Sequence, residues 1–154
     1  MTALGTVRAE AKACRAAFAD SKVGDAVWCL HHQRLIETLI ETPIEPAEDR
    51  IAYILSKKPK AERARRLREF RPVLGPLPEP FDRARTEYEE AWAEYDRACA
   101  RSSAEYVRAV AEYDRAKAEY VRARAEAMPA LEAQHRAEYP GSTWNGQSIF
   151  GEAV

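Results

Sequence analysis

Cys29, His31 and His32 form the one cluster in the sequence whose residue types could bind a metal or perform nucleophilic catalysis. Thiolate and imidazole are zinc ligands, but the C-x-H-H spacing does not match zinc motifs, and the other cysteines and the third histidine lie far away. A Cys–His nucleophile pair would need an acid from Glu37 or Glu41, and no family signature surrounds it. The sequence therefore favours a packed cysteine beside two helix-surface histidines.

Other catalytic signatures are also missing from the sequence. There is no glycine-rich phosphate loop and no G-x-S-x-G motif, because the glycines fall in segments predicted to be helix breaks and turns. We therefore expect a non-enzymatic protein without catalytic residues, metal or cofactor.

The strongest signal for binding a partner is the basic segment of residues 57–71, KKPKAERARRLREFR. Eight basic residues stand there against Glu62 and Glu69, and such side chains bind phosphates in a salt-sensitive, sequence-independent way. The alternative, which the sequence favours over nucleic acid or an acidic protein, is internal pairing with the acidic residues 37–49 and the acidic repeat that follows. The candidate anion-binding residues are Lys57, Lys58, Lys60, Arg63, Arg65, Arg66 and Arg68.

A seven-residue phrase is repeated six times between Glu79 and Arg124, with a four-residue insertion at residues 100–103. In a heptad lettered a to g, an aromatic residue occupies every a position and alanine every d position, so these residues predict one buried helix face. Stacking of bases on the tyrosines is a less favoured interpretation, because the neighbouring acids would repel phosphate. The predicted interface residues are Phe81, Tyr88, Ala91, Tyr95, Ala98, Tyr106, Ala109, Tyr113, Ala116, Tyr120 and Ala123.

The insertion leaves two structures open for the repeat. As a stutter it keeps one continuous helix over residues 81–128, about 72 Å long, whose seam another chain must cover. As a turn it produces a helical hairpin that covers its own seam, and the S-x-x-E pattern from Ser102 to Glu105 is a capping box that favours this alternative. We favour the continuous helix, because neither Gly nor Pro is present to turn the chain.

The remaining elements are predicted from apolar spacing and from Pro and Gly. Helices are expected over residues 4–18, 26–42, 47–58 and 60–70, although residues 27–30 could instead form a short strand. The predicted organisation is an all-α protein with a helical domain (1–71), a proline-rich connector (72–80), a heptad-repeat helix forming a coiled coil or a helical hairpin (81–128) and a C-terminal tail (129–154).

The tail has two competing signals. Pro129 is expected to stop the repeat helix, although residues 130–139 can resume it. The pair Asn145-Gly146 between Trp144 and Ile149 is a β-hairpin signal, and the tail either forms such a hairpin folded back onto the protein or frays.

Composition supports a long helical chain in a reducing compartment. Ala, Glu, Lys, Leu and Arg make up just over half of the 154 residues, which is typical of coiled coils and long helices. Three irregularly spaced cysteines, the lack of a signal peptide and the lack of a membrane-length apolar run lead us to expect a cytoplasmic protein without membrane contact.

The AEYDRA and AEYVRA copies resemble tandem repeats in uncharacterised proteins of phages and environmental bacteria. The segment HHQRLIETLIETPIEPAEDRIAYI, residues 31–54, is similar to the one that precedes the repeats in some of them. The resemblance covers residues 31–128 and implies a phage or accessory bacterial origin, without any activity.

Together these features predict a non-enzymatic interaction or structural protein. We expect it to self-associate into a homo-oligomer or to dock on a protein partner through the heptad seam. The alternatives are a nucleic-acid-binding accessory protein that uses the basic segment, or an inhibitor of a host enzyme.

Overall fold

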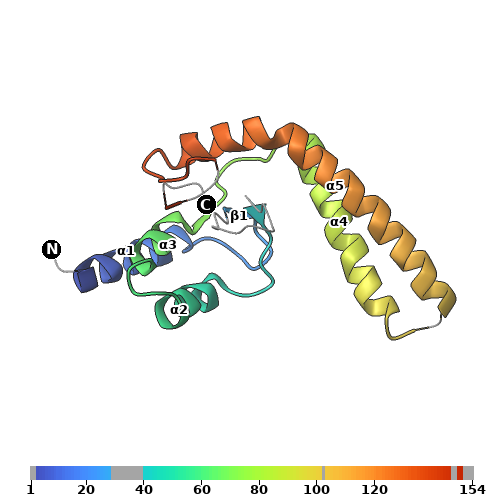
Figure 1. Ribbon diagram of the computed structural model, residues 1–154, viewed down its shortest axis with the longest axis horizontal. Helices are drawn as coiled ribbons and strands as arrows, with labels where there is room; N and C mark the ends of the chain where they lie inside the picture. Colours follow the sequence, from blue (N-terminus) through green and yellow to red (C-terminus); the bar gives the residue numbers. More distant parts are fainter. Residues whose placement is uncertain (1–2, 29–39, 102, 147–148, 151–154) are drawn as a thin grey trace. The chain divides into compact units, whose positions relative to one another are not determined.

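The computed structural model describes residues 3–28, 40–101, 103–146 and 149–150 (Figure 1). This part of the chain contains five helices and a small three-stranded sheet. The chain divides into two compact units, one of residues 1–75 with residues 135–154 and one of residues 76–134. Within the described ranges, no helix is both long and apolar enough to cross a bilayer.

The first unit is built on three helices at positions that the sequence predicted. They are α1 (Ala3–Ala17), α2 (Ala47–Lys57) and α3 (Arg63–Glu69), and Pro46 precedes α2 as its N-cap residue. Each helix buries a stripe of apolar residues against the other two. The resulting core consists of Ala11, Cys14, Phe18, Val27, Ile51, Ile54, Leu67 and Phe70.

The prediction of an all-α fold is wrong in one respect, because the first unit contains an antiparallel sheet in the order β2-β1-β3. Its strands are β1 (Val27–Trp28), β2 (Ile40–Glu41) and β3 (Arg71–Pro72). β1 confirms the strand alternative for residues 27–30 at its first two positions. β2 replaces the end of the predicted helix 26–42, of which residues 29–39 lie outside the described residues.

Long-range pairing explains why the sheet was missed. Val27 pairs with Glu41 on one side and with Pro72 on the other, so both partners are distant in sequence. Pro72 fits because β3 is an edge strand, where a missing N–H does not interrupt the ladder. The predicted connector therefore begins with a strand.

The C-terminal end of α5 (Ser103–Glu138) belongs to the first unit and is held there by a partly buried polar cluster. Both oxygens of Glu138 accept hydrogen bonds: Oε2 from Trp28 Nε1 (2.8 Å) and Leu74 N (3.0 Å), and Oε1 from Gly75 N (2.8 Å). Tyr139 donates its hydroxyl to the carbonyl of Pro72 at 2.6 Å. These bonds fix residues 138 and 139 beside the sheet.

Glu69, which is 3% exposed, anchors the tail that follows. Its carboxylate accepts hydrogen bonds from the hydroxyl of Ser142 and from both the amide (3.0 Å) and the hydroxyl (3.1 Å) of Thr143. Thr143 also donates its hydroxyl to the carbonyl of Ile149 at 2.8 Å, and Ile149 is buried. The tail thus folds back, as one of the two alternatives predicted.

The predicted β-hairpin is nevertheless absent from the described residues of the tail. Gly146 has the positive φ of 95° that a turn at Asn145-Gly146 requires, but neither residues 143–145 nor residues 149–150 form a strand. Two short flanking segments form too few ladder bonds to stabilise a hairpin alone, and here side-chain bonds to Glu69 hold the segment instead.

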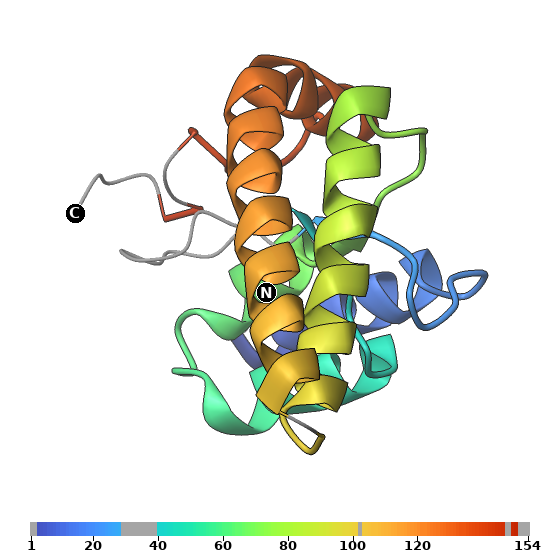
Figure 2. The ribbon, with the colours of Figure 1, turned by 90° about the vertical axis from the view of Figure 1, so that its right-hand side faces the viewer.

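The second unit consists of α4 (Glu79–Ala98) and the α5 residues before His135 (Figure 2). The helices run antiparallel and side by side, so the continuous helix over 81–128 is wrong and the hairpin alternative is correct. The chain turns without Gly or Pro: the amide of Cys99 bonds to the carbonyl of Tyr95, and the amide of Arg101 to that of Ala98. The predicted capping residue, Ser102, lies outside the described residues.

The predicted stop at Pro129 is also wrong, because α5 continues through it to Glu138. A proline inside a helix removes one amide hydrogen bond and costs about 3 kcal/mol. Leu131 and His135 follow it and are almost fully buried. Burial of a leucine side chain contributes about 1.5–3 kcal/mol, which offsets much of that cost.

The anchoring role of Glu69 is testable with Glu69→Gln. The new amide would direct a donor at the donors of Ser142 and Thr143, so we expect the free energy of unfolding to fall by about 1–3 kcal/mol. Hydrogen exchange should show lost protection of the Thr143 amide. Glu45→Gln, at an exposed turn, is the matched control, and equal protection of Thr143 in both variants would contradict the assignment.

Candidate functional site

The alanines of the repeat form the centre of the contact between α4 and α5. Alanine at d is buried in all six copies, three in each helix, at Ala84, Ala91, Ala98, Ala109, Ala116 and Ala123. Because a methyl group occupies little space, the two helices can approach closely along this line. The seam that the sequence predicted is therefore covered within one chain.

The aromatic residues at a interleave along one side of the alanine seam. Rings from α4 and α5 alternate in the order Phe81, Tyr120, Tyr88, Tyr113, Tyr95, Tyr106, with centroid distances of 5.9, 5.1, 5.6, 5.4 and 5.9 Å. The pairs Tyr88–Tyr120 and Tyr95–Tyr113 are stacked. Each aromatic pair of this kind adds about 0.5–1.5 kcal/mol beyond its buried area.

Trp92 extends this row and was missed by the sequence interpretation. Its ring lies 5.8 Å from Tyr95 and 5.5 Å from Tyr113, and it remains 48% exposed. The signal was present, because Trp92 is at position e, which borders a on the helix surface. We call Trp92 and the six a-position rings the aromatic flank.

Hydrogen bonds between tyrosines raise the pKa values of two hydroxyl groups in the aromatic flank. Burial, followed by the bond to Tyr113 (O···O 3.4 Å), raises the pKa of Tyr88 to about 12. The bond to Tyr106 is the largest cause that raises the pKa of Tyr95, also to about 12. Burial raises the pKa of Tyr120. These tyrosines stay neutral at physiological pH and act as paired donors and acceptors.

The opposite flank of the hairpin is charged. The pairs Glu94–Arg97, Glu112–Arg115 and Glu119–Arg122 form at 2.6–2.7 Å between residues three apart in the sequence. Glu87 and Arg115 approach to 4.0 Å between the helices. Exposed pairs of this kind contribute about 0–1 kcal/mol each, so the hairpin depends mainly on the alanine seam and the aromatic flank.

The basic segment lies in the first unit and is only partly neutralised there. Lys57 ends α2, Lys58 and Lys60 lie in the following turn, and the four arginines lie in α3. Arg66 pairs with Glu62 at 2.8 Å and Arg68 with Glu10 at 2.6 Å. The guanidinium carbons of Arg65 and Arg66 lie 5.4 and 5.3 Å from the ring centroid of Phe150.

The acidic residues 37–49 do not neutralise the basic segment in the part of the chain that the structure describes. Glu41 pairs with Arg50 at 3.0 Å, and Glu48 pairs with Arg15 at 2.6 Å. Internal pairing was the favoured interpretation of the basic segment, and two of its predicted acidic partners are thus bound to arginines outside that segment. Glu37 is outside the described residues.

The other chemical candidates form no site in the described residues. Cys29, His31 and His32 lie outside them, and no group of three potential metal ligands occurs inside them. Cys14 is buried and its thiol donates to the carbonyl of Phe70 at 3.4 Å, while burial raises its pKa to about 11. His135 packs on Trp28 with centroids 5.0 Å apart, and burial lowers its pKa. Both residues are structural.

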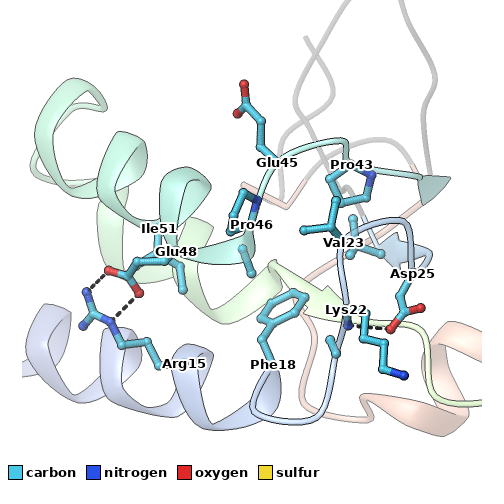
Figure 3. A pocket seen from close by; sticks show the side chains of 13 residues that line it. Arg15, Phe18, Lys22, Val23, Asp25, Pro43, Glu45, Pro46, Glu48 and Ile51 are labelled. Carbon is cyan, nitrogen blue, oxygen red and sulfur yellow. Dashed lines mark hydrogen bonds and ion pairs between the residues drawn. The ribbon is translucent and has the colours of Figure 1, made fainter.

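A shallow groove of about 330 Å³ lies between the end of α1 and the start of α2 (Figure 3). Phe18, Pro43 and Ile51 supply apolar walls. Two of its charged side chains already pair with each other, because Arg15 binds Glu48, and the amide of Lys22 donates to the carboxylate of Asp25 at 2.7 Å. These pairs reduce the number of polar groups that could orient a ligand in the groove.

Comparison with protein-family models, with curated proteins and with solved structures finds no match for this chain. The geometry of the molecule therefore carries the functional argument. Its two candidate surfaces are the aromatic flank and the basic segment.

The alanine seam can be tested with Ala116→Leu. Three additional carbon atoms at this buried position would force the helices apart, so we expect the free energy of unfolding to fall by about 1–3 kcal/mol in urea denaturation. Ala118→Leu is the matched control, because the same exchange occurs at an exposed position of α5 with nearly equal helix propensity. Equal stability of the two variants would contradict the packed seam.

The tyrosine bonds predict a loss of stability at alkaline pH. Tyrosines of the unfolded chain titrate near pH 10, whereas those with a raised pKa in the folded chain keep their protons up to about pH 12. The folded state thus binds more protons between these values, and stability, complete below pH 10, falls as the pH rises toward 12.

Tyrosinate absorbance measures this effect directly. At about pH 11, the folded chain should contain less tyrosinate than the same chain in denaturant, and Tyr88→Phe should reduce the difference. Circular dichroism at each pH verifies that the helices persist. Superimposable titration curves for folded and denatured chains would refute the prediction.

Proposed function

We propose that this chain is a non-enzymatic structural and interaction protein whose aromatic flank is the surface through which two copies associate. The observation that supports this proposal is the continuous row of interleaved rings that stays partly open to solvent. Trp92 is 48% and Tyr106 39% exposed although both contact other rings. Packing of the hairpin through the alanine seam and the ring contacts leaves these parts of both rings exposed, so they are available to a partner.

The composition of the aromatic flank is that of a protein–protein contact. Tyrosine, tryptophan and arginine are the residues at interfaces whose replacement by alanine most often causes a large loss of binding free energy. Here Arg85, paired with Asp82 at 2.7 Å, and Lys117, whose ammonium lies 5.7 Å from the centroid of Tyr113, border the rings. A row of this composition would bury well against another chain.

The rings of the aromatic flank are already ordered before a partner binds. Most of the aromatic rings are fixed between two neighbours from the facing helix, so little side-chain entropy remains to be lost on association. Pre-organisation of this kind raises affinity without additional contacts.

A second copy is the partner that fits this surface best. A tyrosine hydroxyl both donates and accepts a hydrogen bond, so a row of tyrosines is complementary to itself. Two-fold association brings the same surface patch of both chains together and requires exactly this property. The alternative form of this role is docking on a different protein. We place either role in the cytoplasm of a bacterium, in keeping with the phage or accessory bacterial origin that the resemblance of the repeats implies.

Static light scattering of Trp92→Ser tests the proposal. We expect the wild-type chain to show the mass of a dimer at micromolar concentrations. In the variant, the dissociation constant of the dimer should rise about ten-fold or more, as for loss of a tryptophan at the centre of an interface. Circular dichroism should show that the helices remain, because the alanine seam is intact.

Val121→Ser is the matched control. Val121 is 55% exposed on α5 and lies at heptad position b, which is not part of the aromatic flank, so its replacement should leave the mass unchanged. A single-chain mass for the wild type at all concentrations, or equal dissociation of both variants, would overturn self-association through the aromatic flank.

A further inference from the structure

The C-terminal end of α2 and the start of α3 converge on one small surface of the first unit. Arg63 donates from Nε to the carbonyl of Lys58 (2.8 Å) and from Nη2 to that of Ser56 (3.4 Å), which places its guanidinium beside the end of α2. The ammonium of Lys58 lies 5.2 Å from the ring centroid of Tyr53. We define the basic patch as Tyr53, Lys57, Lys58, Lys60 and Arg63.

The charge of the basic patch is not compensated in the described residues. The nearby carboxylates of Glu62 and Glu10 bind Arg66 and Arg68, which lie outside the patch. Within the described ranges, no carboxylate lies within 4 Å of a charged nitrogen of Lys57, Lys58, Lys60 or Arg63. Four positive charges therefore face solvent or backbone carbonyls.

Helix capping accounts for part of this arrangement. Cations are favourable at the end of α2, where the dipole is equivalent to roughly half a negative charge, and Arg63 satisfies two carbonyls there. The half negative charge of the helix end is, however, small compared with the four positive charges of the basic patch. Among the described residues, most of the positive charge thus has no structural counterpart and is available to an anion.

The aromatic member of the basic patch identifies the class of anion. Tyr53 is 48% exposed and lies one helical turn before Lys57 on the same face of α2. An exposed ring beside cations, as Tyr53 is beside Lys58, is the arrangement with which proteins bind single-stranded nucleic acid, since bases stack on the ring and the cations contact the phosphates. A lipid headgroup would use the cations but not the ring face.

We propose that the basic patch binds single-stranded nucleic acid, with Tyr53 stacking on a base and Lys57, Lys58, Lys60 and Arg63 contacting the backbone phosphates. The binding is independent of sequence because it uses phosphates and a stacking face. This role is separate from self-association, because the basic patch and the aromatic flank share no residue and belong to different units.

Counterion release gives the expected salt dependence. Each phosphate contact with a single strand contributes about −0.7 to the slope of log K against log salt concentration, so four contacts predict a slope near −3. Raising the salt from about 50 to 200 mM should then weaken binding about 50-fold. Fluorescence anisotropy of a labelled oligothymidylate of about 20 nucleotides, long enough to contact all four cations, measures the affinity.

Two lysines of the patch have an exact control elsewhere in the chain. Lys57→Gln with Lys60→Gln should weaken binding about ten-fold at low salt and reduce the slope by about 1.4. Lys12→Gln with Lys22→Gln removes the same charge from exposed positions outside the patch and should change the affinity little. An equal loss in both double variants would assign the effect to net charge and overturn the site.

Tyr53 has a control at the same position. Tyr53→Ala should weaken binding about ten-fold without changing the salt slope, whereas Tyr53→Phe keeps the stacking face and should bind as the wild type does. Tighter binding to a duplex of the same length would contradict the stacking role. No anisotropy change at low salt, or lysine-dependent binding to phosphatidylserine vesicles alone, would refute the nucleic-acid assignment.

Discussion

The hydrogen bonds that Glu138 accepts from Trp28, Leu74 and Gly75 are the constraint on which the rest of the structure depends. They join Gly75, which directly precedes the second unit, to Glu138, which follows that unit by four residues. A continuous helix over 81–128 would carry the chain about 72 Å away, and this carboxylate could not return to the sheet. Closure of the hairpin is therefore a condition for completing the first unit, in which Glu138 fills the space beside Trp28.

The heptad repeat meets this condition because its two halves are complementary to each other. Alanine at every d position permits close approach over the whole length, and the rings at a then interleave instead of colliding. Leucine at d would separate the helices and would leave the tyrosines without ring partners. The same repetition explains why the interface predicted between chains forms within one chain: each half presents the surface that a second chain would have presented.

Local signals in the sequence predicted the helices well, whereas long-range contacts account for what was missed. Spacing and proline positions placed α1, α2 and α3, and the heptad identified the buried alanines. The strands of two residues each, the continuation of α5 through Pro129 and the burial of Glu69 depend on partners far away along the chain. Glu69 follows a run of arginines and has the pattern of a surface residue; its bonds from Ser142 and Thr143, both distant in sequence, make it a buried anchor.

The net charge of the chain does not show how positive and negative charges are distributed over its surface, and this distribution matters for binding. The chain carries a formal charge of −1, yet arginines of the charged flank have carboxylates three residues away, whereas the lysines after α2 have none within reach in the described residues. Arginine in AEYxRA copies is locally neutralised by the glutamate of the same copy, so repetition itself keeps the hairpin nearly neutral. The segment before the repeat lacks this periodic acid. Its positive charge is therefore concentrated on one surface, which is why we expect this surface to attract phosphate at low salt although the whole chain is weakly acidic.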